Sequence, residues 1–159
     1  LKDIPIIDIH VIALGFIIRT QSGNALINTP TSPWLLIIIF LLALFWAVGK
    51  RKVELATLRS VASRHKRVYK FYTGGFLLSL TNIIASMLLL AYIFFTSSTH
   101  GMVLMWTIPI ATFMVFRYLY FIYADKEEAQ KSEQIFLDPQ MLIALVFWVV
   151  SSVYLLYWV

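Results

Sequence analysis

The chain has 159 residues, of which 60% are hydrophobic and 13% charged, with a formal net charge of +5 and a mean hydropathy of +0.82. Soluble domains carry about 25% charged residues, so this composition excludes an ordinary soluble protein and indicates a membrane protein. The lack of cysteine excludes disulfides, thiolate metal sites and a cysteine nucleophile.

Unbroken apolar stretches predict five transmembrane helices and no β-strand. Four stretches approach the roughly 20 residues that a bilayer crossing needs, and the first is weaker because it contains Asp8 and His10. The expected spans are 4–18, 33–49, 74–96, 101–123 and 141–159. Because these stretches do not alternate as barrel strands do, we expect an all-α membrane bundle that forms a single domain.

The first stretch carries charges that are hard to place in a membrane. Asp8 and Arg19 are eleven residues apart, which returns to nearly the same helix face, and Gly15 lies on that face too. A charge within a span costs about 2.5–3.5 kcal/mol unless it has a partner, so we expect all three residues to face the bundle interior. Alternatively, each charged side chain lies near a helix end and reaches water, with 19–32 as a loop.

The segment 50–72 is a predicted loop that holds eight of the chain's 13 Lys and Arg residues. These are Lys50, Arg51, Lys52, Arg59, Arg64, Lys66, Arg67 and Lys70. The positive-inside rule predicts that this loop and the loop 124–139 are cytoplasmic and that the C-terminus lies on the opposite side. One interpretation is a topology signal that also binds anionic lipid headgroups, at about 1 kcal/mol per basic residue.

A second interpretation is a phosphate-handling site at the start of the same segment. Lys50 and Arg51 directly follow an apolar stretch, and Glu54 comes one turn later. A carboxylate among cations can orient a lysine or hold a divalent ion that bridges phosphate oxygens, whereas headgroup binding would not need Glu54. Arg117 is either an anion contact on the same side or a residue that reaches water past an aromatic belt. Asp138 is well placed to cap the last helix.

Several classes of site find no support in the sequence. It contains no Walker loop, no zinc-protease or EF-hand motif, and no arrangement of Ser, His and Asp typical of hydrolases. The three histidines are scattered, and no nucleic-acid-binding module is present. The positive-inside rule accounts for the excess of Lys and Arg, because these residues gather in cytoplasmic loops.

The order of several short motifs is informative. They are Ile7-Asp8, Gly15-Phe16, Arg19, Gly23, Ser32-Pro33-Trp34, Gly49-Lys50-Arg51, Glu54-Leu55, Arg117-Tyr118 and Asp138. Together they resemble the C-terminal half of the UbiA superfamily of membrane transferases, and within it the decaprenyl-phosphate phosphoribosyltransferase branch. The chain lacks the Asp-x-x-x-Asp pattern of ordinary UbiA prenyltransferases, and the resemblance covers nearly its whole length.

The resemblance implies a nine-helix bundle of the cell (inner) membrane, of which this chain would supply the last five helices. It also implies transfer of a phosphoribosyl group from phosphoribosyl pyrophosphate to a polyprenyl (decaprenyl) phosphate, in the synthesis of a cell-wall glycolipid precursor. The Mg²⁺ cofactor of that branch is held by an Asn-Asp-x-x-Asp motif, which we expect in a preceding N-terminal half because this chain has none.

The substrate-binding candidates under this resemblance are Lys50, Arg51, Glu54, Arg117, Arg19 and Asp8. Lys50 and Arg51 would contact phosphate, and Glu54 would orient them or a sugar hydroxyl. Two alternatives stay open: a UbiA-type polyprenyltransferase with another acceptor, and a small non-catalytic membrane protein whose basic loop binds anionic lipids.

Overall fold

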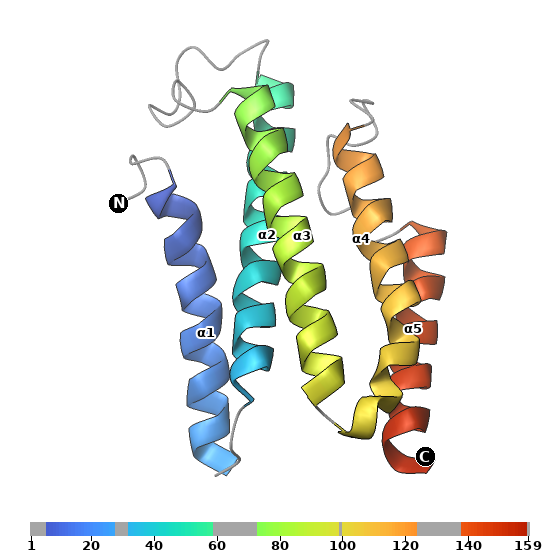
Figure 1. Ribbon diagram of the computed structural model, residues 1–159. Coiled ribbons are helices and arrows are strands. Elements are labelled where there is room, and N and C mark those ends of the chain that lie inside the picture. The colour runs from blue at the N-terminus through green and yellow to red at the C-terminus, as the bar shows by residue number, and fades with distance from the viewer. Residues whose placement is uncertain (1–5, 28–31, 59–72, 99, 124–137, 159) are drawn as a thin grey trace. The chain divides into compact units, whose positions relative to one another are not determined.

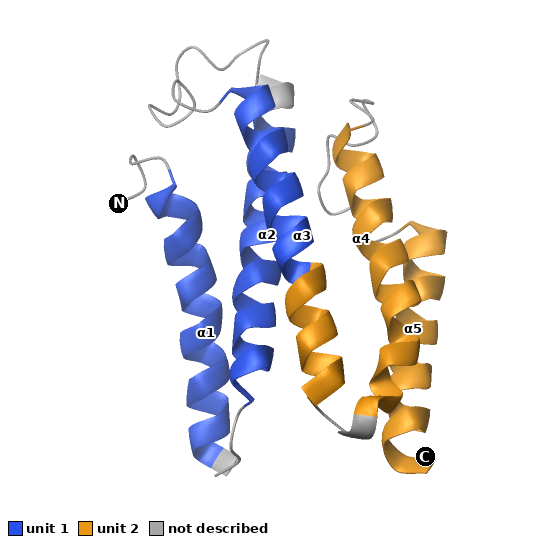
Figure 2. Ribbon diagram, viewed as in Figure 1, with its two compact units in different colours: residues 1–88 blue, residues 89–159 orange. Residues whose placement is uncertain are grey.

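The computed structural model describes residues 6–27, 32–58, 73–98, 100–123 and 138–158, and the elements in these residues are all helical (Figure 1). In chain order they are α1 (Ile7–Ile27), α2 (Pro33–Leu58), α3 (Gly74–Ser98), the 3₁₀ helix η2 (His100–Thr107), α4 (Ile108–Tyr123) and α5 (Pro139–Trp158). The prediction of an all-α protein is confirmed. The single predicted domain divides into two compact units, residues 1–88 and 89–159, whose boundary falls inside α3 (Figure 2).

Helix α1 is longer than its apolar stretch predicts, so the expected loop at 19–32 is wrong for its first part. The helix continues to Ile27 and includes Arg19. Thr20 and Ser22 donate their hydroxyl hydrogens to the carbonyls of Phe16 and Ile18, at 3.0 and 2.8 Å. Polar side chains are thereby satisfied within the helix itself, which a hydropathy pattern does not register.

Helix α2 also passes its predicted end, because it continues to Leu58. The first part of the expected basic loop 50–72 is therefore helical, and Lys50 and Arg51 lie within α2 rather than at its end. Lys, Arg, Glu, Leu and Ala are all good helix formers, so the helix continues where apolarity stops. Arg59, Arg64, Lys66, Arg67 and Lys70 lie outside the described residues.

The remaining elements lie close to their predicted ranges. Helix α3 runs two residues past residue 96, and α5 begins at Pro139 with Asp138 before it. The expected span 101–123 consists of η2 followed by α4, with Pro109 in the first turn of α4. Proline is tolerated there because the first amides of a helix lack partners within the helix.

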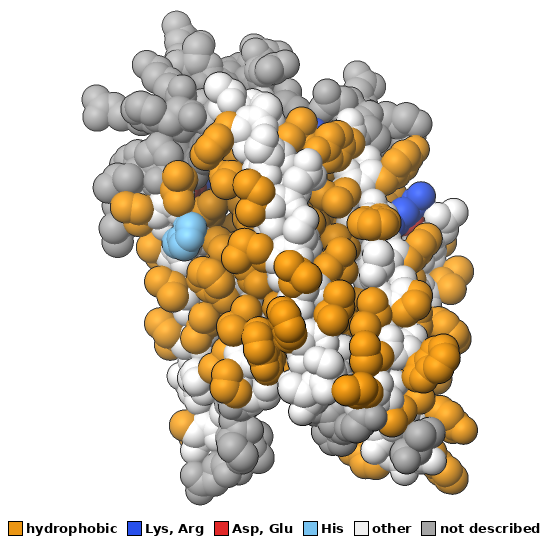
Figure 3. Space-filling model, viewed as in Figure 1, with side chains coloured by type: hydrophobic (Ala, Val, Ile, Leu, Met, Phe, Trp, Pro, Cys, Tyr) orange, Lys and Arg blue, Asp and Glu red, His pale blue; other side chains and the backbone are white. Residues whose placement is uncertain are grey.

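Four of the described helical stretches are long and apolar enough to cross a membrane, and this supports an integral membrane protein. They are Pro33–Leu55, Gly74–Ser98, Met102–Tyr123 and Pro139–Trp158. On the face drawn in Figure 3, hydrophobic side chains cover much of the described surface. Helix α1 does not meet the same criterion, so the fifth crossing and the sidedness of the loops stay predictions.

In the first unit, α1 packs alongside α2 (Figure 1). The buried residues of α1 are Asp8, Ile9 and Ala13, all in its first half. Gly15 is exposed, and a Cβ added there would meet nothing within 4 Å, so the expectation that this glycine faces the bundle interior is wrong.

In the second unit, a chain of hydrogen bonds joins the end of α3, η2 and α5. The Trp148 Nε1–H donates to the Tyr92 hydroxyl at 2.8 Å, and the Tyr92 and Thr107 hydroxyls are 2.5 Å apart. Thr107 in turn donates to the Leu104 carbonyl at 2.6 Å. Because the Thr107 hydrogen is used there, Tyr92 is the donor to Thr107. Polar groups inside spanning segments need such partners, since lipid supplies none.

Candidate functional site

A cluster of one guanidinium and two carboxylates lies in the first unit, where the start of α1 meets the charged end of α2. The Arg51 Nε–H donates to Asp8 Oδ2 at 3.0 Å, and Arg51 Nη1 donates to Glu54 Oε2 at 2.7 Å. Two of the guanidinium's donor nitrogens are therefore held by carboxylates on different helices, which fixes both the position and the plane of the group.

The three side chains differ in how far solvent reaches them. The Asp8 side chain is 3% exposed, whereas those of Arg51 and Glu54 are 19% and 28% exposed. A buried carboxylate is costly unless it is paired, and Arg51 provides that pairing. Asp8 is thus placed to orient Arg51, while Arg51 and Glu54 form the side of the cluster that a ligand can reach.

The neighbouring lysines complete the charge of the cluster. Lys50 is exposed, and Lys52 is 8% exposed and therefore buried. Three cations on α2 and the two carboxylates leave a net charge of one positive. Glu54 bonds Arg51, whereas the spacing of the residues had suggested that it orients a lysine or holds a divalent ion. The cationic side chains of the cluster that solvent reaches are those of Lys50, which is exposed, and Arg51, which is partly exposed.

The structure does not bring Arg19 to this cluster. Arg19 is exposed on the second half of α1, so the expectation that it faces the interior together with Asp8 is wrong. The two residues share a helix face by periodicity, but the buried residues of α1 all lie in its first half.

His10 is exposed, its ring packs edge-on against Phe40 at 6.0 Å, and its Nδ1 bonds the Ile6 carbonyl at 2.8 Å. His10 therefore serves the local structure of α1.

Arg117 has a partner that the sequence analysis did not identify. Its Nε and Nη2 donate to the two carboxylate oxygens of Asp138, each at 3.0 Å. Its guanidinium also lies over the rings of Tyr120 and Phe121, at 5.4 and 4.8 Å. The predicted helix cap is confirmed, because Asp138 Oδ2 also accepts the Met141 amide hydrogen at 3.1 Å.

The bidentate contact has an electrostatic consequence. The hydrogen bonds from Arg117 hold the pKa of the Asp138 carboxyl below its ordinary value, with a further contribution from the Met141 amide. The Arg117–Asp138 pair belongs to the second unit and is a separate feature from the cluster around Arg51.

The Asp8–Arg51 and Arg117–Asp138 ion pairs could have been found from the sequence by an argument from topology. Consecutive spans run antiparallel when the connection is short, so the start of one helix lies beside the end of the next. That rule pairs Asp8, in the first turn of α1, with the end of α2, and it pairs Asp138 with the end of α4. Neither pair is visible from the periodicity of a single helix, because its two residues lie on different elements.

The described residues do not provide a ligand set for a divalent cation. No group of three or more His, Asp or Glu side chains gathers in this part of the chain. Asp8 and Glu54, the two carboxylates of the cluster, are both engaged by Arg51. The Mg²⁺ implied by the resemblance therefore does not fit the described residues.

Comparison with known proteins finds distant relatives. No protein-family profile matches the chain. A decaprenyl-phosphate phosphoribosyltransferase of Corynebacterium glutamicum is 24% identical over 98% of this chain and 49% of its own length. Proteins of the same name from Mycolicibacterium smegmatis and Mycobacterium tuberculosis are 28% and 27% identical over 58% of this chain. The chain thus spans about half or less of the length of these relatives, and it is a distant homologue of transferases with that name.

Proposed function

We propose that this chain is the C-terminal part of a UbiA-type membrane transferase that moves a phosphoribosyl group from phosphoribosyl pyrophosphate to a polyprenyl phosphate. The observation that carries the proposal is the similarity to the Corynebacterium glutamicum enzyme, which extends along 98% of the chain. The cluster around Arg51 supports it, because it offers an oriented cation to a phosphorylated substrate.

The proposed chemistry needs preorganised positive charge. Departure of pyrophosphate from C1 of the ribose leaves negative charge on the leaving oxygens, while the sugar gains oxocarbenium character. Donors that already point at those oxygens stabilise the transition state, because they need not reorient when the bond breaks. Arg51 meets this requirement, since Asp8 and Glu54 fix its guanidinium. Lys50, exposed on the same helix, would neutralise a second phosphate oxygen.

The roles of the two carboxylates follow from their exposure. Asp8 is a positioning residue, since its buried side chain acts through Arg51. Glu54 also orients Arg51, and its greater exposure lets it accept a hydrogen bond from a sugar hydroxyl. We propose that the magnesium ligands of the reaction lie outside the described residues. We also propose that the charged end of α2 is cytoplasmic, in keeping with the positive-inside rule.

The test is a transfer assay with the full-length protein in membranes, with radiolabelled phosphoribosyl pyrophosphate and decaprenyl phosphate as substrates. Arg51→Ala is expected to lower turnover about 100-fold or more, as removal of a preorganised donor does. Arg51→Lys should recover little of that loss, because one ammonium cannot reproduce the fork that contacts both carboxylates. Arg19→Ala is the matched arginine control and should change the rate by about twofold at most.

Two outcomes would count against the proposal. Wild-type protein that inserts into membranes but transfers no label to decaprenyl phosphate would remove the phosphoribosyl activity. Equal rates for wild type and Arg51→Ala would remove the cluster from the site. In that case, loss of binding to anionic vesicles in Arg51→Ala would favour the lipid-binding interpretation of the basic segment.

A further inference from the structure

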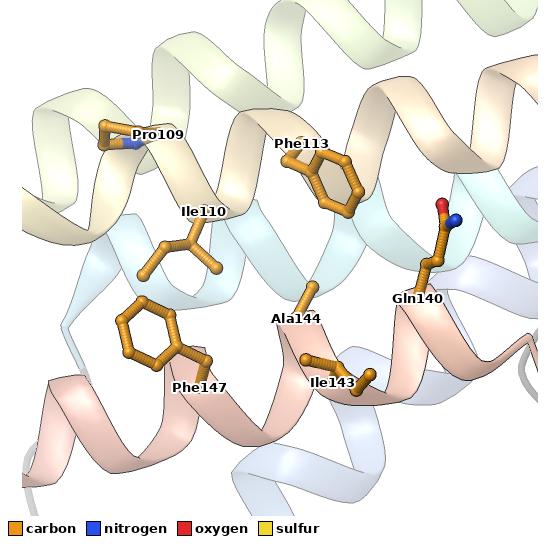
Figure 4. Close-up of a pocket in the computed structure, with 7 residues that line it drawn as sticks. All are labelled: Pro109, Ile110, Phe113, Gln140, Ile143, Ala144 and Phe147. Atoms are coloured by element: carbon orange, nitrogen blue, oxygen red, sulfur yellow. The ribbon is translucent and has the colours of Figure 1, made fainter.

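An apolar groove of about 470 Å³ runs between α4 and α5 in the second unit (Figure 4). Pro109, Ile110 and Phe113 of α4 form one wall, and residues of α5 form the other. The α5 residues are Gln140, Ile143, Ala144 and Phe147. Both helices belong to stretches that are long and apolar enough to cross a membrane. A groove with this lining suits a hydrocarbon chain and offers almost nothing to a polar ligand.

One end of the groove is charged. Arg117 follows Phe113 by one helical turn on α4, and Asp138 precedes Gln140 by two residues. The Arg117–Asp138 ion pair therefore lies beyond the Phe113 and Gln140 end, next to the first residue of α5. The apolar groove and the ion pair at its end thus match the two parts of a lipid, a hydrocarbon chain and a polar headgroup.

The ion pair keeps hydrogen-bonding capacity for a ligand. Arg117 uses Nε and Nη2 for Asp138, and its Nη1 makes no hydrogen bond to any described residue. The Arg117 side chain is 23% exposed, so it is not closed off from the surface. The two N–H groups of Nη1 are suited to a phosphate oxygen.

We propose that this groove binds a glycerophospholipid of the bilayer, with one acyl chain between α4 and α5 and the phosphodiester on Arg117 Nη1. The groove has about the volume of a single fatty-acyl chain and is well short of the volume of a decaprenyl chain. Electrostatics favour the same occupant. Asp138 neutralises much of the arginine charge, so a singly charged phosphodiester is accommodated better than a phosphate monoester, which carries about −1.5 to −2 charges. The lipid is a bound component of the protein and not its substrate, so the inference does not depend on the proposed transfer reaction.

Photo-crosslinking of the full-length protein in detergent micelles tests the site. The probe is a phosphatidylethanolamine with a diazirine in the middle of one acyl chain, and labelled peptides are identified by mass spectrometry. Label is expected on groove-lining residues of both helices. Ala144→Leu fills the groove and should lower this label at least fivefold. Val146→Leu is the matched control, because Val146 is exposed about 200° around α5 from Ala144 and should leave labelling unchanged.

The headgroup contact is tested by Arg117→Gln and by competition. Arg117→Gln should lower the labelling of the groove at a limiting probe concentration. In the wild-type protein, an excess of phosphatidylethanolamine without a diazirine should compete with the probe and abolish this labelling. Label spread evenly over the lipid-facing surfaces, or equal label in wild type and Ala144→Leu, would overturn the proposal. Displacement by equimolar decaprenyl phosphate would assign the groove to the polyprenyl substrate and would also overturn it. Ala144→Leu leaves the ion pair intact, so the test stands even if Arg117→Gln fails to fold.

Discussion

At the scale of single residues, the chain places the Asp8–Arg51 and Arg117–Asp138 ion pairs where one helix begins and its neighbour approaches its end. Asp8 is nearly inaccessible and Arg51 is not, so the burial cost of that pair falls mainly on the carboxylate. A buried ion pair adds little net stability by itself, but removing one partner is strongly destabilising because a buried charge then loses its counter-charge. The consequences of single and double substitutions should therefore differ sharply.

Arg51→Ala is expected to destabilise the first unit by about 3–5 kcal/mol, because it removes the cation that is hydrogen-bonded to the buried Asp8 carboxylate. The double variant Asp8→Asn with Arg51→Ala should recover much of that loss, since the uncompensated charge is gone. Chemical denaturation in detergent measures both free energies of unfolding. Additive effects in the double variant would contradict the ion pair.

The stability of the second unit should depend on pH through Asp138. The folded state holds the pKa of this carboxyl below its ordinary value, so folding favours the ionised form. The contribution is therefore complete above the ordinary pKa and is lost as pH falls through the lower, folded-state value. Melting temperatures recorded from neutral pH down to strong acid should show this loss in wild type and a flatter profile in Asp138→Asn. Parallel profiles would contradict the assignment.

At the scale of elements, apolarity predicted that the helices exist but not where α1 and α2 end. The stretch at 33–49 was recognised because lipid-facing residues are apolar, yet α2 continues to Leu58. Helix propensity continues through Lys50, Arg51 and Lys52, whereas hydropathy falls there. For the same reason α1 includes Arg19, which the sequence analysis placed at the start of a loop.

The hydrogen-bond chain that joins α3, η2 and α5 is an interaction between elements, and the sequence alone did not indicate it. Tyr92→Phe should cost more than Trp148→Phe, because it removes the acceptor of Trp148 and the donor to Thr107 together. Each interhelical hydrogen bond in a membrane protein averages about 0.6 kcal/mol and reaches about 1.7. Unfolding of the two variants in detergent gives the comparison, and a smaller cost for Tyr92→Phe would contradict a stabilising role for both hydrogen bonds of the Tyr92 hydroxyl. Phe95, which contacts Tyr92 only through its ring, offers a control in Phe95→Leu.

At the scale of the whole molecule, the sequence predicted the class of protein well. Its composition and apolar stretches indicated a membrane protein, which agrees with four helices long and apolar enough to cross a membrane. Its motif order resembles that of membrane transferases, which agrees with the names of its distant relatives. The partners of Asp8 and Arg117 could not come from any one helix, since each lies on a neighbouring element. Site assembly is a tertiary property, and hydropathy carries no information about it.

The predicted sidedness can be measured directly because the chain contains no cysteine. Three spans separate Lys50 from Trp158, so a cysteine at each position should face opposite sides of the membrane. Both side chains are exposed. A membrane-impermeant maleimide should label Lys50→Cys only in inverted vesicles and Trp158→Cys only in right-side-out ones. Label on both from one side would overturn the three-span arrangement.

The Arg117–Asp138 pair also constrains how the chain is made. The two residues are 21 positions apart, so Arg117 emerges from the ribosome while Asp138 is still inside the exit tunnel. During that interval a guanidinium near the end of an apolar segment has no counter-charge. The translocon must therefore hold α4 at its lateral gate, or leave the segment with Arg117 at the aqueous boundary, until α5 begins to emerge. The second unit should consequently enter the bilayer as a helical hairpin, with the release of one helix coupled to the synthesis of the next.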